Sequence, residues 1–248
     1  MKYFSIIFLL LFFNSCNEEK KQLTAQQIID KTIENAGGEL YENAKIDFTF
    51  RNTQYSSKRQ NGQFELTRSI SDSTGLKKDV VTNNGFQQFL NDTKVDLPDS
   101  TATKYSNSVN SVHYFVQLPY GLNSDAVIKE LVGEAEIKGQ NYYEIQVTFK
   151  QEGGGTDHDD LYMYWINKEE FTIDYFAYKF YTGKGGIRFR EAYNARTIEG
   201  LRFVDYKNYK IEPWEKIDLN SLDELFQNGE LELLSEIKTE DISISTSK

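Results

Sequence analysis

The 248-residue chain contains one cysteine, three prolines and two histidines. A single cysteine cannot form an internal disulfide, and so little proline excludes collagen-like and proline-rich classes. Basic residues are also few, since 28 Lys and Arg stand against 38 Asp and Glu and give a formal net charge of −10. Nucleic-acid binding requires a basic surface, so we expect no nucleic-acid partner. With 39% hydrophobic and 14% aromatic residues, the chain has enough apolar surface for a folded core.

The first fifteen residues are typical of a signal peptide. Lys2 precedes the apolar run 3–13, which is shorter than the roughly 20 residues of a membrane-spanning helix. Ser15-Cys16 follows, and this arrangement resembles a bacterial lipobox, in which the cysteine is lipidated and becomes the first residue of the mature chain. We therefore predict a signal peptide over 1–15, then a lipidated Cys16 and a polar tether over 16–23 that attach the protein to a lipid membrane. A plain secretory signal with an unmodified cysteine is the alternative.

The rest of the chain is expected to form one helix and then a long antiparallel meander. Thr24 and Gln27 form a capping-box pattern, and the apolar residues that follow lie on one helical face. From Ala44 the apolar residues alternate with polar ones, and Asn61-Gly62 is typical of a hairpin turn. Later strands are expected over 161–166, 171–181, 187–196 and 201–211, helices over 106–117 and 221–227, and a last strand within 230–245.

Aromatic residues are concentrated between His158 and Trp214, and the predicted strands 161–166 and 171–181 are apolar on both faces. Such strands are either covered on both sides or line an apolar cavity. A filled core is one interpretation, and a pocket for a hydrophobic ligand is the other. If the strands line a pocket, an arginine near its mouth could bind the headgroup or carboxylate of the ligand. The alternative is that the arginines are solvated or paired with carboxylates. The candidate ligand-binding residues are Tyr162, Tyr164, Trp165, Tyr175, Phe176, Tyr178, Arg188 and Arg190.

Several segments resemble known families. Residues 133–147 (GEAEIKGQNYYEIQV) and 164–167 (YWIN), together with the N-terminal helix, resemble the outer-membrane lipoprotein-carrier (LolA/LolB-like) superfamily. Residues 188–194 and 205–209 resemble an uncharacterised Bacteroidota lipoprotein family with a domain of unknown function. The superfamily resemblance implies an unclosed antiparallel barrel around helices, with an apolar cavity for acyl chains. We accordingly expect a mainly β half barrel around one or two helices, with residues 24–248 as a single domain that ends in an acidic segment.

The chain carries no G-x-S-x-G, H-E-x-x-H, P-loop or G-x-G-x-x-G motif. His113 lies on the apolar face of a predicted helix, so we expect it to be packed or hydrogen-bonded rather than catalytic. Asp157, His158 and Asp159 follow three glycines and could bind a metal ion, although the same composition is typical of a hairpin turn. We expect no cofactor and no metal, and a metal-assisted hydrolase built on this loop is the alternative.

The combined expectation is a non-enzymatic cell-envelope lipoprotein, anchored in the outer membrane on its periplasmic side or its outer surface. It would bind a lipid or other hydrophobic ligand in the concave face of the half barrel, or act as an envelope accessory protein. Besides the hydrolase, a purely structural surface module is the alternative, and the shape of the interior distinguishes these hypotheses. The sequence predicts neither the identity of the ligand nor the oligomeric state.

Overall fold

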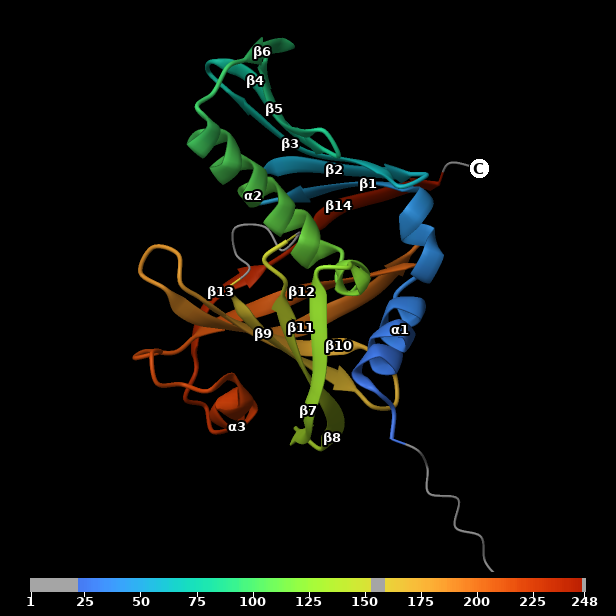
Figure 1. Ribbon diagram of the computed structural model, residues 1–248, viewed down its shortest axis with the longest axis vertical. Helices are drawn as coiled ribbons and strands as arrows, with labels where there is room; N and C mark the ends of the chain where they lie inside the picture. Colours follow the sequence, from blue (N-terminus) through green and yellow to red (C-terminus); the bar gives the residue numbers. More distant parts are fainter. Residues whose placement is uncertain (1–21, 153–158, 247–248) are drawn as a thin grey trace, which may run out of the picture.

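The computed structural model of the chain describes residues 22–152 and 159–246, and it contains two antiparallel sheets of seven strands each. Within these residues neither sheet closes into a barrel, and one long helix, α2, runs between the two sheets (Figure 1). The expected mainly β fold, an open antiparallel meander around few helices, is therefore confirmed.

The elements have the following bounds. The first sheet comprises, in spatial order, β14 (Glu240–Thr246), β1 (Ala44–Phe50), β2 (Thr53–Gln60), β3 (Gln63–Asp72), β4 (Gly75–Thr82), β5 (Gly85–Leu90) and β6 (Thr93–Val95). The second comprises β13 (Glu232–Ile237), β12 (Leu201–Lys210), β11 (Gly186–Ile198), β10 (Ile173–Phe180), β9 (Leu161–Asn167), β8 (Gln140–Phe149) and β7 (Val127–Ile137). The α-helices are α1 (Ala25–Asn35), α2 (Asp99–Val116) and α3 (Leu222–Gln227), and the 3-10 helices are η1 (Gly38–Asn43), η2 (Tyr120–Asn123) and η3 (Leu219–Ser221).

Local sequence signals place most of these elements. The predicted capping box is present, because the Thr24 side chain accepts from the Gln27 backbone and the Gln27 side chain accepts from the Thr24 backbone. The hairpin between β2 and β3 turns at Asn61 (φ 51°) and Gly62 (φ 73°), the left-handed pair that a two-residue hairpin requires.

Helix α2 begins seven residues earlier than the expected 106–117. Its first residue, Asp99, directly follows Pro98, and a proline restricts the chain at the point where a helix starts. Ala102 and Tyr105 are the only apolar or aromatic side chains in its first two turns, and two such residues are too few to show a helical periodicity in the sequence.

The expected single strand within 230–245 is wrong, because this segment forms two strands in different sheets. β13 pairs with β12, whereas β14 crosses to the first sheet and pairs with β1. Buried Asp205 fixes the crossover by accepting from the Thr239 backbone (3.0 Å) and from Arg196 (3.1 Å). The spacing of Ile237 and Ile242 was a signal of this break, since side chains five positions apart cannot lie on one face of a regular strand.

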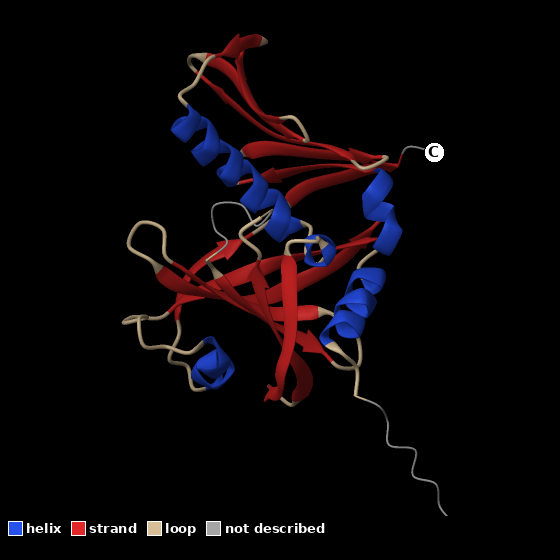
Figure 2. Cartoon of the chain, viewed as in Figure 1, coloured by secondary structure: helices blue, strands red, loops and turns tan. Residues whose placement is uncertain are grey.

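The central strands β9 and β10 of the second sheet are apolar on both faces, and both faces are covered. On the face toward the first sheet, Tyr164 and Phe176 belong to a core cluster with Ile28 and Ile29 of α1. On the opposite face, Met163 and Trp165 pack against the C-terminal segment that includes α3, which Figure 2 shows on the side away from α2. All described strands, helices and core clusters lie within residues 22–246, so a chain of residues 22–248 retains every contact described here.

Candidate functional site

A row of side chains crosses the inner face of the second sheet, the face toward α2. Strand register places Tyr164 of β9 beside Phe176 of β10, Phe176 beside Arg190 of β11, and Arg190 beside Asn208 of β12. The row therefore changes from aromatic to polar across four adjacent strands. Period-2 alternation explains this arrangement, because each of these residues lies on the same face of its strand.

Helix α2 covers the aromatic end of the row. The Tyr114 hydroxyl lies 2.9 Å from the Tyr164 hydroxyl, and burial raises the pKa of Tyr114 to about 12, so the pair is neutral at physiological pH. The Phe115 ring stacks on Phe176 (5.5 Å between ring centroids, 16° between planes) and on Tyr178 (5.4 Å, 27°). The helix is thus attached to the second sheet mainly by aromatic contacts.

The opposite face of α2 is attached to the first sheet by buried polar groups. His113 is 1% exposed, and its Nε2 donates to the Thr67 backbone oxygen (3.1 Å) while its Nδ1 accepts from Gln117 (3.3 Å). Gln117 also donates to Ser57 (3.0 Å) and accepts from Arg59 (2.6 Å). The expectation that His113 is a packed, hydrogen-bonded residue is confirmed.

Arg190 is the most unusual side chain of the inner face. It is 8% exposed, and its guanidinium carbon lies 4.2 Å from the ring centre of Phe115, with Phe176, Tyr178 and Tyr206 within 6 Å. Its Nη2 donates to the Tyr178 hydroxyl (3.2 Å), but among the described residues no carboxylate pairs with it and its buried Nε has no hydrogen-bond partner. Burying a charge costs several kcal/mol, and four cation–π contacts of about 0.5–2 kcal/mol each offset a comparable amount. Ring faces accept no conventional hydrogen bond, so they leave the remaining N–H donors of the guanidinium without acceptors.

A cavity of about 260 Å³ adjoins Arg190, between α2, the end of β1 and strands β10 to β13; we call it the inter-sheet cavity. Within residues 22–152 and 159–246, two arginines are its only charged lining residues, and Asn208 contributes a buried Oδ1 that accepts no hydrogen bond from these residues. The walls are otherwise mostly apolar. The lining residues are Phe50, Arg51, Ser111, Val112, Phe115, Val116, Tyr178, Arg190, Asn208 and Ile237.

The structure divides the eight sequence-derived candidates between the two faces of the sheet. Tyr178 and Arg190 line the inter-sheet cavity, whereas Arg188, on the same face, donates to the Ile187 backbone oxygen and lies over the Phe180 ring. Three further candidates are buried in the inner core: Tyr162, Tyr164 and Phe176. The last two, Trp165 and Tyr175, are buried on the outer face under the C-terminal segment.

On that outer face, Trp165 has a structural partner. Its Nε1 donates to Glu144 Oε1 (3.0 Å), and burial, with a smaller contribution from Asp223, raises the pKa of Glu144. Trp165 is fully buried among Met163, Phe189 and the C-terminal segment. It therefore lies in the core of the face that points away from the inter-sheet cavity.

Eight of the ten described lining residues were not predicted as site residues from the sequence. They are Phe50, Arg51, Asn208, Ile237 and the α2 residues Ser111, Val112, Phe115 and Val116. Phe115 lies in the predicted helix 106–117, so its place on a helix was predicted from the sequence. No local pattern shows which strands that helix covers. Asn208 lies two positions after Tyr206, and this spacing in a strand places the two side chains on the same face. The spacing does not show that a cavity adjoins this face.

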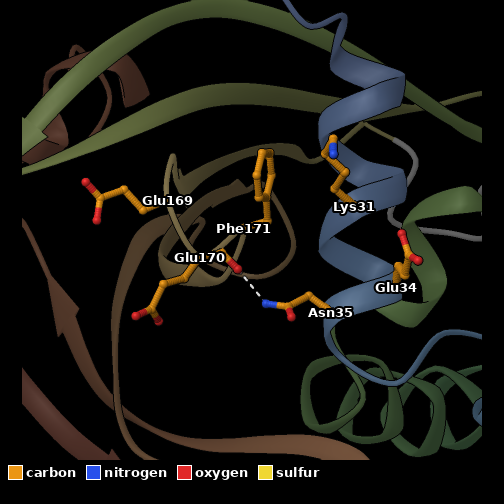
Figure 3. Close-up of a pocket in the computed structure, with 6 residues that line it drawn as sticks. All are labelled: Lys31, Glu34, Asn35, Glu169, Glu170 and Phe171. Atoms are coloured by element: carbon orange, nitrogen blue, oxygen red, sulfur yellow. Dashed lines mark hydrogen bonds between the residues drawn. The ribbon is translucent and has the colours of Figure 1, made fainter.

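A larger groove, of about 600 Å³, lies between α1 and residues 169–171, which connect β9 and β10 (Figure 3). Lys31 lies over the Phe171 ring at 5.1 Å, and Asn35 donates to the Glu170 backbone oxygen (2.5 Å). Five of its six lining residues are polar or charged, so it offers little apolar surface to a hydrophobic ligand. They are Lys31, Glu34, Asn35, Glu169 and Glu170, with Phe171 as the sixth.

Some predicted sites lie outside the described residues, namely Cys16, Asp157 and His158. Within residues 22–152 and 159–246, no three His, Cys, Asp or Glu side chains converge as a metal site would require. The same two segments include no helix that is both long enough and apolar enough to span a membrane.

Comparison with known proteins gives one family match. The model of a family of unknown function, DUF6503, matches residues 2–239, which confirms the expected resemblance to a family with a domain of unknown function. No curated protein matches the chain.

Several solved structures are similar to this one at low sequence identity. A LolA superfamily protein from Nitrosomonas europaea has a TM-score of 0.49 and 14% identity, with 92% of this chain and 95% of that chain covered. A DUF1329 family protein from Desulfovibrio piger has a TM-score of 0.42 and 12% identity, with 89% and 91% covered. A putative outer membrane lipoprotein-sorting protein domain from Vibrio parahaemolyticus has a TM-score of 0.36 and 7% identity, with 82% and 97% covered.

Proposed function

The chain belongs to the DUF6503 family of unknown function, and from that premise and the site geometry we propose that it is a non-enzymatic binding protein for a lipid or other hydrophobic ligand. The inter-sheet cavity is the binding site. The proposal includes a lipid anchor at Cys16 and a location in the outer membrane of a Bacteroidota cell envelope, as the lipobox-like residues and the family resemblance of 188–194 and 205–209 imply.

The observation that carries the proposal is a cavity between the two sheets in which six of the ten described lining residues are apolar or aromatic. Ligand sites are typically concave and mostly apolar with few polar groups, and the inter-sheet cavity fits this description. Its volume of about 260 Å³ lies just below the roughly 300–1,000 Å³ of ordinary small-molecule sites. A medium-length acyl chain is therefore a better match than a large polycyclic ligand.

Binding of a neutral fluorescent probe tests this proposal. We expect N-phenylnaphthylamine to bind saturably to residues 22–248, and decanol to displace it. Val112→Trp should abolish binding because the larger ring would fill the cavity that Val112 lines. Val132→Trp is the matched control, since Val132 is 38% exposed on β7 and does not line the cavity.

Thermal melting of both variants shows whether they fold. Absence of saturable probe binding to the folded wild-type chain would contradict the proposal, as would equal binding by the two valine variants.

A further inference from the structure

We propose that the inter-sheet cavity selects ligands with an anionic headgroup, a carboxylate or a phosphate monoester, and that Arg190 is the residue that binds it. The inference rests on the proposed function and specifies the ligand class of the same site.

The charge of the lining is the first observation. The chain has a net charge of −10, yet among the described residues the charged side chains that line the inter-sheet cavity are two arginines and no acid. Arg190 lies at the buried wall, and Arg51 is exposed at the turn between β1 and β2. A ligand that enters from the Arg51 side would therefore meet positive charge at the opening and again inside.

The unfilled hydrogen-bonding capacity of Arg190 is the second observation. A guanidinium carries five N–H donors, and only the Nη2 bond to Tyr178 is made within the described part of the chain. The rings of Phe115, Phe176 and Tyr178 stabilise the cation without accepting conventional hydrogen bonds. The two oxygens of a carboxylate or phosphate match the planar fork of an arginine and would satisfy the remaining donors.

Asn208, the residue paired with Arg190 on the next strand, supplies a third observation. It lies directly beside Arg190 across the β11–β12 pair, donates to Ser235 (3.3 Å), and has a buried Oδ1 with no donor. Buried polar atoms without partners are rare in folded proteins, so this end of the cavity favours a polar group beside Asn208. Because Oδ1 accepts, it needs a donor, which the P–OH of a singly ionised phosphate monoester or a water supplies and a carboxylate does not. The anionic oxygens of either headgroup would lie toward the Arg190 donors. Water, as well as a headgroup, could reach this end, so binding must be tested with matched ligands.

The experiment compares three amphiphiles with the same ten-carbon tail in the probe-displacement assay on residues 22–248 at neutral pH: decanoate, decyl phosphate and decanol. Because a hydrogen-bonded charge pair stabilises the complex, we expect the two anions to bind with about tenfold or more higher affinity than decanol. Preference for decanoate alone would identify a fatty-acid-type carboxylate, and preference for decyl phosphate alone would identify a phosphate headgroup.

Variants assign the preference to a residue. Arg190→Gln should remove the preference for the anions while decanol still binds, whereas Arg188→Gln, two positions along the same strand face and outside the cavity lining, should retain it. If Arg190→Gln does not fold, Arg51→Gln at the exposed rim provides the second variant, and it should reduce the preference by a few-fold.

The outcomes separate the inference from the proposed function. Equal displacement by all three amphiphiles would overturn the anion selectivity and leave the proposed function intact, and so would a preference for decanol. A preference for the anions that survives Arg190→Gln would overturn the role of Arg190. Failure of the probe to bind at all would overturn both.

Discussion

His113 is the buried imidazole that attaches α2 to the first sheet, and its surroundings keep it neutral. Burial, with a smaller contribution from the charge of Arg59, lowers its pKa from 6.5 to about 4, although the bond to the Thr67 backbone acts in the other direction. In the unfolded chain the same imidazole takes up a proton near pH 6.5. The native state therefore binds fewer protons than the unfolded state between these two values.

From this difference we predict that the free energy of unfolding decreases as the pH falls from 6.5 to 4. The stabilisation is fully present above pH 6.5, and about 3 kcal/mol of it is lost by pH 4, because each pKa unit corresponds to about 1.4 kcal/mol. Urea unfolding at a series of pH values measures the effect. In His113→Gln, which does not titrate, the slope over this window should be smaller, and equal slopes in the two proteins would contradict the prediction.

At the scale of single elements, the C-terminal segment with α3 completes the core of the outer face. Leu222 is fully buried in a cluster with Met163, Trp165 and Phe189, whereas Leu234 on β13 is 45% exposed. We predict that Leu222→Ala lowers the free energy of unfolding by about 2–5 kcal/mol, because it leaves a cavity under a packed sheet. Leu234→Ala is the matched control and should cost less than about 0.5 kcal/mol.

Denaturant unfolding of these two variants measures the difference directly. A small loss of stability for Leu222→Ala would show that the segment is only loosely attached to the sheet. A large loss with little change in the slope of the denaturation curve would place it in the cooperative core.

Elements defined by neighbouring residues could be predicted from the sequence, and elements defined by distant partners could not. The capping box at Thr24 and the hairpin at Asn61-Gly62 depend on a few adjacent residues, so their chemistry is visible locally. The pairing of β14 with β1 joins the two ends of the described chain, and no local pattern encodes it. The early start of α2 was missed for a similar reason, since its first turns lack apolar periodicity.

The candidate site shows the same limit. Alternation correctly separates Tyr164 and Trp165 onto opposite faces, but it cannot show which face α2 covers. Of the candidate residues, only Tyr178 and Arg190 line the inter-sheet cavity, because the other aromatics are buried by helices and by the C-terminal segment. A cavity depends on where packing is incomplete, which is a property of the assembled layers.

At the scale of the whole molecule, the described body and the proposed lipid anchor at Cys16 occupy separate parts of the chain. The first described helix begins at Ala25, and the only cysteine, Cys16, lies nine positions before it, directly after the apolar run 3–13 and Asn14-Ser15. The intervening residues are mostly polar, as expected for a tether between a lipid anchor and a folded body.

We predict that Cys16 of the full-length protein is lipidated when it is expressed in a bacterium with a lipoprotein-processing pathway. Radiolabelled palmitate should be incorporated into the wild type, which should fractionate with membranes, and not into Cys16→Ser. Asn14→Ala is the matched control, because it changes the same segment toward the small residues usual in a lipobox and should retain the label. Equal labelling of wild type and Cys16→Ser would contradict the anchor, since no other cysteine exists in the chain to carry the lipid.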